Sequence, residues 1–446
     1  MRYLLTLLLF SLLLHSLNCS FQAKLFNKMN KEKKGENLII SPLSIFQALS
    51  LAANGARGKT QSEMLDLLQS DTIEELNKIN YNIISQFKEF KTIDIANAVM
   101  TKFTPLEEFS NISQEYLAPV EPLESVEQVN NWCSNKTHGK IDKILEKLNP
   151  LTLMIILNAV YFIGEWLSPF DSRVTKNLTF YNLGKEKIKI DTMIQEEYFN
   201  YYEDKKVQAI ELEFVEDYMS AIIILPAKGT DINKYIDNLS TSTKEYNKII
   251  KGLKNVKVNL RLPKFELRFE ETLNDALSSL GMYNAFDSDN ADFTGLREKG
   301  KLYINKVIHK TYLRVFEDGC EAAAVTAIEM DGCAEEDKEK IYNMRVNRPF
   351  LFLLKNYRLP AGYDLVFMSK IEKFDNFYTI LGQEDEDDDD EIDNNNKKIS
   401  NELLIIIIVF GVVLVLSLIG LAIWKKLFCC RSKKEENELI EQLDFE

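Results

Sequence analysis

Side chains that could support catalysis or bind a metal are few in this chain. The sequence has 446 residues and three histidines, of which His15 lies in an apolar N-terminal run. The spacings HExxH, CxxC and GxSxG, typical of zinc sites, redox sites and serine nucleophiles, do not occur. His309 stands in an apolar alternating stretch and is interpreted as a hydrogen-bonded core residue. We therefore expect a protein that is not an enzyme, with no catalytic residue, no metal and no cofactor.

One glycine-containing stretch, Gly55–Thr60, partly matches a phosphate-binding loop. The spacing of that loop requires a glycine where this chain has Ala53. The stretch also follows a helical pattern, whereas the motif follows a strand. We therefore do not interpret it as a nucleotide site.

The charge of the chain argues against nucleic acid as a partner. The sequence has 68 acidic and 54 basic residues, which gives a net charge of −14. No basic stripe is evident that would neutralise phosphates. The spaced lysines within Lys248–Lys264 are interpreted as a solvated face, so heparin binding is not indicated.

The elements that would position any site are helical in the first part of the chain. Phe21–Lys34 and Pro42–Ala53 carry apolar residues three and four positions apart, which predicts two amphipathic helices. Ser41 is placed to cap the second helix, and Pro42 suits its first turn.

Strand patterns dominate later. Leu153–Ile163 and Ala221–Pro226 are apolar runs typical of buried strands. Val256–Leu267 and Lys301–Asp318 alternate between apolar and polar residues. Because helices and strands interleave without a linker or repeat, we expect one large α+β domain.

Apolar runs near both ends of the chain predict membrane targeting. Tyr3–Leu14 follows one arginine and precedes small or polar residues, a pattern typical of a signal peptide. Leu403–Trp424 is almost unbroken apolar sequence, and as a helix of about 33 Å it would cross a hydrocarbon core of about 30 Å. The acidic run Glu384–Asp393 precedes this span and the basic run Lys425–Lys434 follows it, which predicts a cytosolic tail. We expect a type I membrane protein whose main domain is extracellular or lumenal.

The predicted organisation has five segments. They are a signal peptide (1–19), one folded domain (20–381), an acidic unfolded stalk (382–402), a transmembrane helix (403–424) and a cytoplasmic tail (425–446).

Cysteine usage and glycosylation signals agree with this topology. After the signal peptide, three cysteines face the oxidising side, too few for a disulfide framework: Cys133, Cys320 and Cys333. Four sequons predict N-glycosylation, at Asn111, Asn135, Asn177 and Asn238.

Six stretches of the chain resemble the serpin family of serine protease inhibitors, in the order and spacing of that family. They are Glu36–Met64, Val129–Leu145, Leu157–Tyr181, Leu260–Met282, Val307–Ala327 and Asn347–Lys355. The resemblance covers essentially all of Phe21–Ile380. It implies the serpin fold, an α+β domain with three β-sheets, about nine helices and an exposed reactive loop between Glu317 and Asn347.

The resemblance also implies three groups of site residues. The residues that match the polar cluster where the central sheet opens are Ser41, Ser44, Asn158 and His309. Trp166, Lys264 and Glu317 match the top of that sheet, where the loop enters, and Lys264 and Glu317 are expected to form an ion pair. The implied hinge comprises Glu317, Gly319, Cys320, Glu321, Ala322, Ala323, Ala324 and Thr326.

In the family, a protease cleaves the loop and the loop then inserts into the sheet as a new strand. The sequence meets the demands of such a strand. Glu317–Arg348 contains no proline, so every residue can donate a ladder hydrogen bond. The residues that would face inward are uncharged: Cys320, Ala322, Ala324, Thr326, Ile328 and Met330.

The bond that the protease cleaves is left open between two main alternatives, with Lys340 and Arg345 as further basic options. Family spacing counted from Glu317 selects Cys333 and Ala334. Counting back from Asn347 favours Lys338 and Glu339, because the second half of the loop is longer than usual. A disulfide between Cys320 and Cys333 is a further hypothesis, and it would prevent insertion by closing the loop on itself.

The resemblance predicts a suicide inhibitor of a protease, most simply of the serine type, that forms a covalent complex at a membrane surface. The alternative is a non-inhibitory serpin that acts as a binding or chaperone-like surface ectodomain. A purely structural surface protein is a third reading, which rests only on the predicted membrane span.

Overall fold

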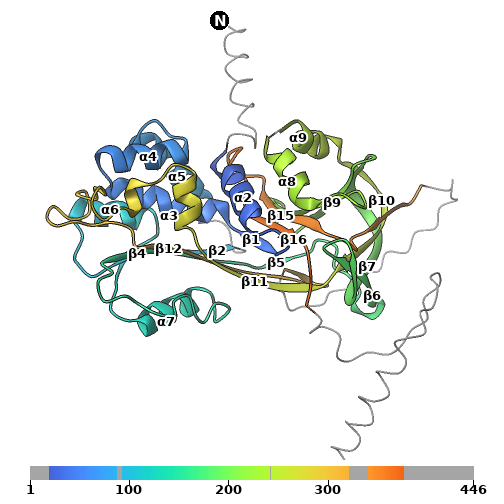
Figure 1. The fold of residues 1–446 in the computed structure, drawn as a ribbon. Helices are drawn as coiled ribbons and strands as arrows, with labels where there is room; N and C mark the ends of the chain where they lie inside the picture. The colour runs from blue at the N-terminus through green and yellow to red at the C-terminus, as the bar shows by residue number, and fades with distance from the viewer. Residues whose placement is uncertain (1–19, 88–92, 242, 321–339, 376–446) are drawn as a thin grey trace, which may run out of the picture. The chain divides into compact units, whose positions relative to one another are not determined.

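Helices and strands interleave along the chain (Figure 1). The computed structural model describes residues 20–87, 93–241, 243–320 and 340–375, which all belong to one unit that ends before Gly382. Its helices are α2 (Phe21–Glu32), α3 (Pro42–Gly55), α4 (Gly58–Leu68), α5 (Ile73–Phe87), α6 (Glu107–Glu115), α7 (Val126–Lys136), α8 (Ile232–Thr241), α9 (Thr243–Gly252) and α10 (Asn274–Ser279), with 3₁₀ turns at Ser172–Val174 and Asn284–Phe286.

Helix α3 shows how local sequence sets an element that later supports the site. The Ser41 side chain accepts a hydrogen bond from the backbone N–H of Ser44, and Pro42 occupies the first turn, as predicted. Every residue of α3 is buried. A helix with no exposed face belongs in the interior. Helix α3 contacts both of the large sheets described below, and α2, α4, α5 and α6 pack against it (Figure 1).

One sheet has five strands. In spatial order they are β11 (Phe265–Thr272), β12 (Lys306–Val315), β4 (Met154–Phe162), β2 (Ile93–Thr101) and β3 (Val120–Pro122). Strands β12 and β4 run parallel, while β11 and β2 pair antiparallel with them from either side. Helix α7 covers one face and α3 the other (Figure 1).

A second sheet has nine strands. The main path is β1 (Leu38–Ile40), β16 (Leu365–Ile371), β15 (Phe350–Asn356), β9 (Met219–Pro226), β8 (Val207–Glu213), β7 (Glu186–Glu203), β10 (Lys254–Pro263) and β14 (Tyr342–Arg345), and β6 (Lys176–Asn182) pairs with β7. A third, two-stranded sheet joins β5 (Gly164–Glu165) to β13 (Gly319–Cys320). The described strands therefore form three sheets.

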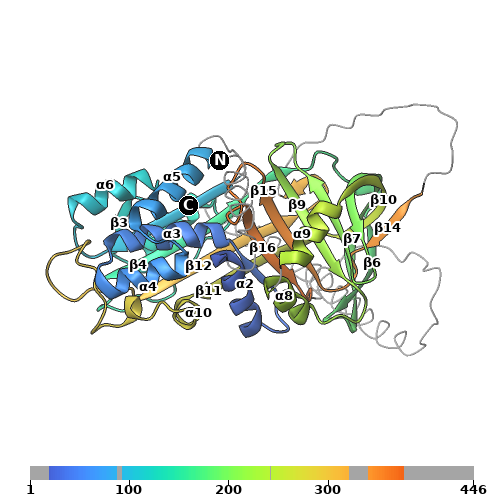
Figure 2. The same cartoon turned by 90° about the horizontal axis from the view of Figure 1, so that it is seen from above.

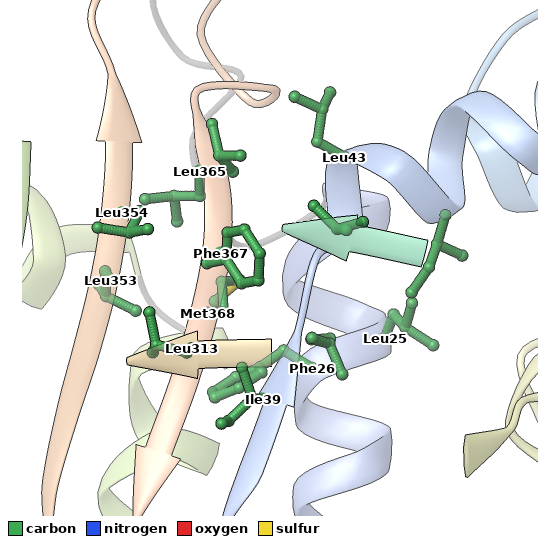
Figure 3. Close-up of a cluster of buried hydrophobic side chains, with 14 of the residues drawn as sticks. Leu25, Phe26, Ile39, Leu43, Leu313, Leu353, Leu354, Leu365, Phe367 and Met368 are labelled. Atoms are coloured by element: carbon green, nitrogen blue, oxygen red, sulfur yellow. The ribbon is translucent and has the colours of Figure 1, made fainter. Parts of the chain in front are cut away.

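The two large sheets share one hydrophobic core. Figure 3 shows part of it, where side chains of α2, α3, β1, β12, β15 and β16 meet. The labelled residues are Leu25, Phe26, Ile39, Leu43, Leu313, Leu353, Leu354, Leu365, Phe367 and Met368. A core that is continuous across both sheets explains why the long chain forms one unit rather than several.

Two strand predictions need correction. The predicted strand Val256–Leu267 is two strands, because the chain passes at Lys264 from the nine-stranded to the five-stranded sheet. The predicted strand Lys301–Asp318 begins only at Lys306. The preceding carbonyl of Asn305 accepts a hydrogen bond from the Asn274 side chain, and Ile304 donates to Ala285, so this backbone is bonded outside the sheet.

Within the described ranges, no helix is both long and apolar enough to span a bilayer. The predicted signal peptide (1–19), stalk (382–402), transmembrane helix (403–424) and tail (425–446) lie outside those ranges. Their assignment stays a prediction.

Candidate functional site: the top and centre of the five-stranded sheet

The parallel pair at the centre of the five-stranded sheet is the first feature of the site. The register places Lys306 opposite Ile155 and Tyr312 opposite Tyr161. Both strands have antiparallel neighbours on their other sides. A parallel ladder is slightly less stable per residue than an antiparallel one. A strand placed antiparallel to both at the β4–β12 boundary would replace one parallel ladder by two antiparallel ladders.

The chain reverses direction just after β12. Phe316 and Gly319 exchange backbone hydrogen bonds of 2.8 and 3.2 Å, which closes a tight turn. Strand β13 then runs antiparallel to β5, with Gly319 opposite Glu165 and Cys320 opposite Gly164. Because β5 follows β4 in the chain, the turn directs β13 alongside the continuation of β4.

Gly319 is required at this turn. Its φ is +150°, and a Cβ atom built on it would lie 2.0 Å from the carbonyl oxygen of Gly164. Any larger residue would have to push the two short strands apart. The hinge glycine implied by the resemblance is thus needed for a close backbone approach.

Trp166 holds the same turn from the side. Its indole N–H donates a 2.9 Å hydrogen bond to the carbonyl of Phe316, and its backbone N–H donates to the carbonyl of Asp318 at 2.9 Å. The ring is buried and stacks on Phe214, with the centroids 4.5 Å apart. Sequence reasoning missed Phe214, which carries no motif of its own.

Glu317 and Lys264 form the ion pair that the resemblance implied. The Lys264 Nζ lies 3.1 Å from the Glu317 Oε1, and the Thr175 hydroxyl donates to the same oxygen at 2.7 Å. Burial would raise the pKa of Glu317, but hydrogen bonds from Thr175 and the backbone, together with Lys264, hold it below the ordinary value. The carboxylate is therefore kept charged while only 7% exposed. Nothing in the sequence around Thr175 indicated this contact.

A polar row crosses the middle of the five-stranded sheet. His309 of β12 lies opposite Asn158 of β4, which lies opposite Asn97 of β2. The Asn158 side-chain oxygen contacts the His309 Nδ1 and accepts a 2.9 Å hydrogen bond from the Ser44 hydroxyl. The Asn158 amide donates to Asn97. All of these residues are buried, and the row spans the boundary at which a strand would enter.

His309 joins this row to helix α3. Its Nε2 accepts a 3.2 Å hydrogen bond from the backbone N–H of Ser41, so the proton belongs on Nδ1, which donates to Asn158. Burial lowers the pKa of His309 to about 3. The ring is therefore neutral at physiological pH. The structure brings together the four residues assigned to this cluster and adds Asn97, whose polar side chain in a strand was the available signal.

Two cysteines in the described residues are free thiols. Cys320 and Cys133 are both fully buried, and burial raises the pKa of each, that of Cys133 to about 12. Cys320 faces the core, as the inward position in the hinge requires. Cys333, its partner in the disulfide hypothesis, lies outside the described ranges.

Several assigned residues are not described by the structure. They are the hinge residues Glu321, Ala322, Ala323, Ala324 and Thr326 and the reactive-bond residues Cys333, Ala334, Lys338 and Glu339. The sequon residues Asn111, Asn135, Asn177 and Asn238 are all exposed. No cluster of histidine, cysteine and carboxylate side chains that could hold a metal occurs among the described residues.

Comparison with known proteins places this geometry in a family. The family model described as serpin (serine protease inhibitor) matches residues 16–371. A leukocyte elastase inhibitor of Xenopus tropicalis is 29% identical over 357 residues, covering 75% of this chain and 93% of that protein. An intracellular coagulation inhibitor 2 of Tachypleus tridentatus is 31% identical, covering 72% of this chain and 83% of that protein.

A solved structure agrees with these matches. The native state of tengpin, a thermophilic serpin, superimposes with a TM-score of 0.72 at 31% identity. The match covers 80% of this chain and 94% of tengpin.

Proposed function

The chain belongs to the serpin family of serine protease inhibitors, and we propose that it traps a protease by loop cleavage and insertion between β4 and β12. The turn at Phe316–Gly319 is the observation that carries this proposal. It points the hinge antiparallel to both β12 and β4 at the upper end of their shared boundary. This is the direction in which an added strand would convert one parallel ladder into two antiparallel ladders.

The chemical step belongs to the protease. Its nucleophile attacks the carbonyl carbon of the reactive bond and forms an acyl-enzyme, while the amine of the following residue leaves. The freed segment after Cys320 then inserts before water hydrolyses the ester. The inhibitor supplies a cleavable bond and a destination for the cleaved loop, and none of its side chains acts as a catalyst.

The free energy that strand insertion would release is comparable to the stability of a protease domain. An inserted strand of this length would gain about a dozen ladder hydrogen bonds, each worth about 1 kcal/mol net. The sum, on the order of 10 kcal/mol, is comparable to the typical stability of about 5–15 kcal/mol of a protein domain. Insertion could therefore distort an attached protease.

The reactive bond is proposed as Cys333–Ala334, with Lys338–Glu339 as the alternative. Lys338 would suit a trypsin-like protease. Cys333 would suit an enzyme with a small or apolar specificity pocket, or a cysteine protease. We further propose that Leu403–Trp424 spans a membrane and displays the inhibitor on the extracellular or lumenal side, with glycans on the four exposed sequons.

The decisive experiment incubates the full-length chain in detergent with trypsin, chymotrypsin, elastase and a papain-like enzyme. We expect an SDS-stable covalent complex with at least one of them and release of a C-terminal fragment on denaturation. Mass spectrometry of that fragment identifies the reactive bond. Cleavage within residues 321–339 by every enzyme without any complex would instead support the alternative, a non-inhibitory surface ectodomain.

A further inference from the structure

One face of the nine-stranded sheet lies beside the end of the reactive loop. Strand β14 begins three residues after residue 339 and forms the edge of the sheet, with β10 and then β7 next to it (Figure 2). Val258, Leu260 and Leu262 of β10 are buried, so the alternate residues of this strand face the other side.

Two arginines stand side by side on this outer face. Arg261 of β10 and Arg345 of β14 are direct partners in the strand register. Like charges placed opposite each other destabilise a strand pair. Burial, and then the charge of Arg345, lower the pKa of Arg261. The fold thus bears an electrostatic cost at this position.

Nothing among the described residues offsets that cost. The Arg261 Nε is buried and has no hydrogen-bond partner. Arg314, whose Nε is also buried and unbonded, instead stacks on the Phe316 ring at 3.9 Å. In the described part of the chain, neither Arg261 nor Arg345 has an ion pair or a cation–π contact.

The surrounding groups leave the two arginines unneutralised. On β7, Ile194 lies opposite Arg261. The nearest carboxylate along that strand, Glu196, is already bonded to Lys257 at 3.4 Å and to the Asn259 amide at 3.4 Å. Two adjacent guanidinium groups with no ion pair among the described residues make a positive site that an anion would neutralise.

We propose that Arg261 and Arg345 form a second contact site for the protease, binding a carboxylate on the surface of the enzyme that engages the reactive loop. Guanidinium groups bind carboxylates through paired, charge-assisted hydrogen bonds. Two exposed side chains lie four positions along from the pair, Ile341 just before β14 at 42% exposure and Tyr198 on β7, opposite Lys257, at 47% exposure. Tyrosine and arginine are enriched where protein interfaces derive most of their affinity.

The position fits a partner held by the loop. Arg345 lies seven residues after Lys338 and twelve after Cys333 in the sequence. At about 3.3 Å per extended residue, it is at most about 23 or 40 Å from either reactive bond. A protease domain has a diameter in this range. This site deepens the proposed function and rests on it.

The first test asks whether the pair binds carboxylates at all, independently of inhibition. The probe is a fluorescein-labelled hexaglutamate peptide, titrated against the full-length chain in detergent at fixed ionic strength, with hexaglutamine as the neutral control. We expect saturable anisotropy changes with hexaglutamate only. The double variant Arg261→Gln with Arg345→Gln should weaken binding at least tenfold.

A matched variant removes the same charge elsewhere. Lys251→Gln with Lys254→Gln alters two exposed lysines, one in the last turn of α9 and one at the start of β10, and should bind the peptide as the wild type does. Equal peptide affinity in all three proteins would overturn the site. Tight binding of a heparin fragment with no peptide binding would also overturn it, in favour of a polysaccharide site.

The second test measures the rate of covalent complex formation with each protease. The arginine variant should lower the association rate about tenfold for the enzyme that reacts fastest with the wild type, with little effect on the slower enzymes. The lysine variant should leave all rates unchanged. If the association rate fell equally for every enzyme, the substitutions would be acting through the reactive loop, and this result would overturn the proposal. Loss of peptide binding with no complex from any protease would support the arginine site and count against the proposed function alone.

Discussion

At the scale of single residues, the hinge depends on small, uncharged side chains at fixed positions. Cys320 is fully buried at the start of the hinge, and Gly319 allows the backbone to approach Gly164. His309 is neutral because it is buried and hydrogen-bonded on both ring nitrogens. Each of these residues therefore supports a prediction that does not depend on knowing the target protease.

Ala324→Arg should convert an inhibitor into a substrate, because Ala324 is an inward position of the strand that is proposed to insert. An arginine cannot occupy a buried site without a partner, because leaving its charge in the sheet costs several kcal/mol. We expect normal cleavage in the loop and no SDS-stable complex. Ala324→Ser is the matched control and should still form the complex, since serine is small and uncharged. Equal complex yields from the two variants would show that this position need not insert.

The stability of the domain should fall as the pH decreases below about 6.5, in part through His309. The pKa of this histidine is about 6.5 when unfolded and about 3 when folded, so the unfolded chain binds the extra proton between these values. Above pH 6.5 the titration of His309 does not change the free energy of unfolding. Below pH 6.5 it lowers that free energy by up to about 1.4 kcal/mol per pH unit. Urea unfolding of the wild type and of His309→Gln from pH 7.5 to 4.5 measures the difference. An unchanged pH slope in the variant would contradict this role.

At the scale of elements, the two-residue pairing of β13 with β5 decides where the hinge sits before cleavage. It is held by the Phe316–Gly319 turn and by Trp166, rather than by the length of its own ladder. A pairing this short should be sensitive to one change at its closest contact.

Gly319→Ala should separate β13 from β5 and expose the Cys320 thiol. The added Cβ would overlap the carbonyl oxygen of Gly164 at 2.0 Å. Labelling with a maleimide should become at least tenfold faster at Cys320. Cys133, which lies on α7 and is buried in a separate cluster, serves as the internal control and should stay protected. Equal protection of both thiols in the variant would mean that the turn tolerates the methyl group.

At the scale of the whole molecule, the intact fold is not the most stable arrangement that the chain could reach under the proposed mechanism. The five-stranded sheet retains a parallel pair at its centre, and the buried polar row of His309, Asn158 and Asn97 crosses that pair. A strand entering there would have to separate His309 from Asn158 before it gained its own ladder bonds.

Cleavage of the loop should therefore raise the thermal stability of the domain. About a dozen new hydrogen bonds at about 1 kcal/mol each correspond to an increase in Tm of about 15 °C for a domain of about 360 residues. Calorimetry before and after limited proteolysis within residues 321–339 measures the change. The Ala324→Arg variant, cleaved in the same way, should show a much smaller increase. A wild-type Tm that stays constant after cleavage would exclude insertion.

Much of the fold could be read from the sequence because helix caps and strand periods are local. Ser41 and Pro42 start α3 as predicted, and the apolar runs at Leu153–Ile163 and Ala221–Pro226 are strands β4 and β9. The ordered motifs likewise indicated the family before any contact was known. Those motifs also predicted the Lys264–Glu317 ion pair at the top of the five-stranded sheet.

Contacts between distant strands were decided only by the tertiary structure. Asn97 meets Asn158 across 61 positions in sequence, and the alternation within either strand does not fix which residue lies opposite which. The break at Lys264, by contrast, left a signal in the sequence. Pro263 cannot donate a ladder hydrogen bond, and the apolar positions shift there from even to odd numbers. The sequence did not indicate that Arg261 and Arg345 lie side by side, and the β10–β14 register shows that they are direct partners. The sequence by itself determined the elements and their inward faces, while register and sheet order determined which side chains could act together.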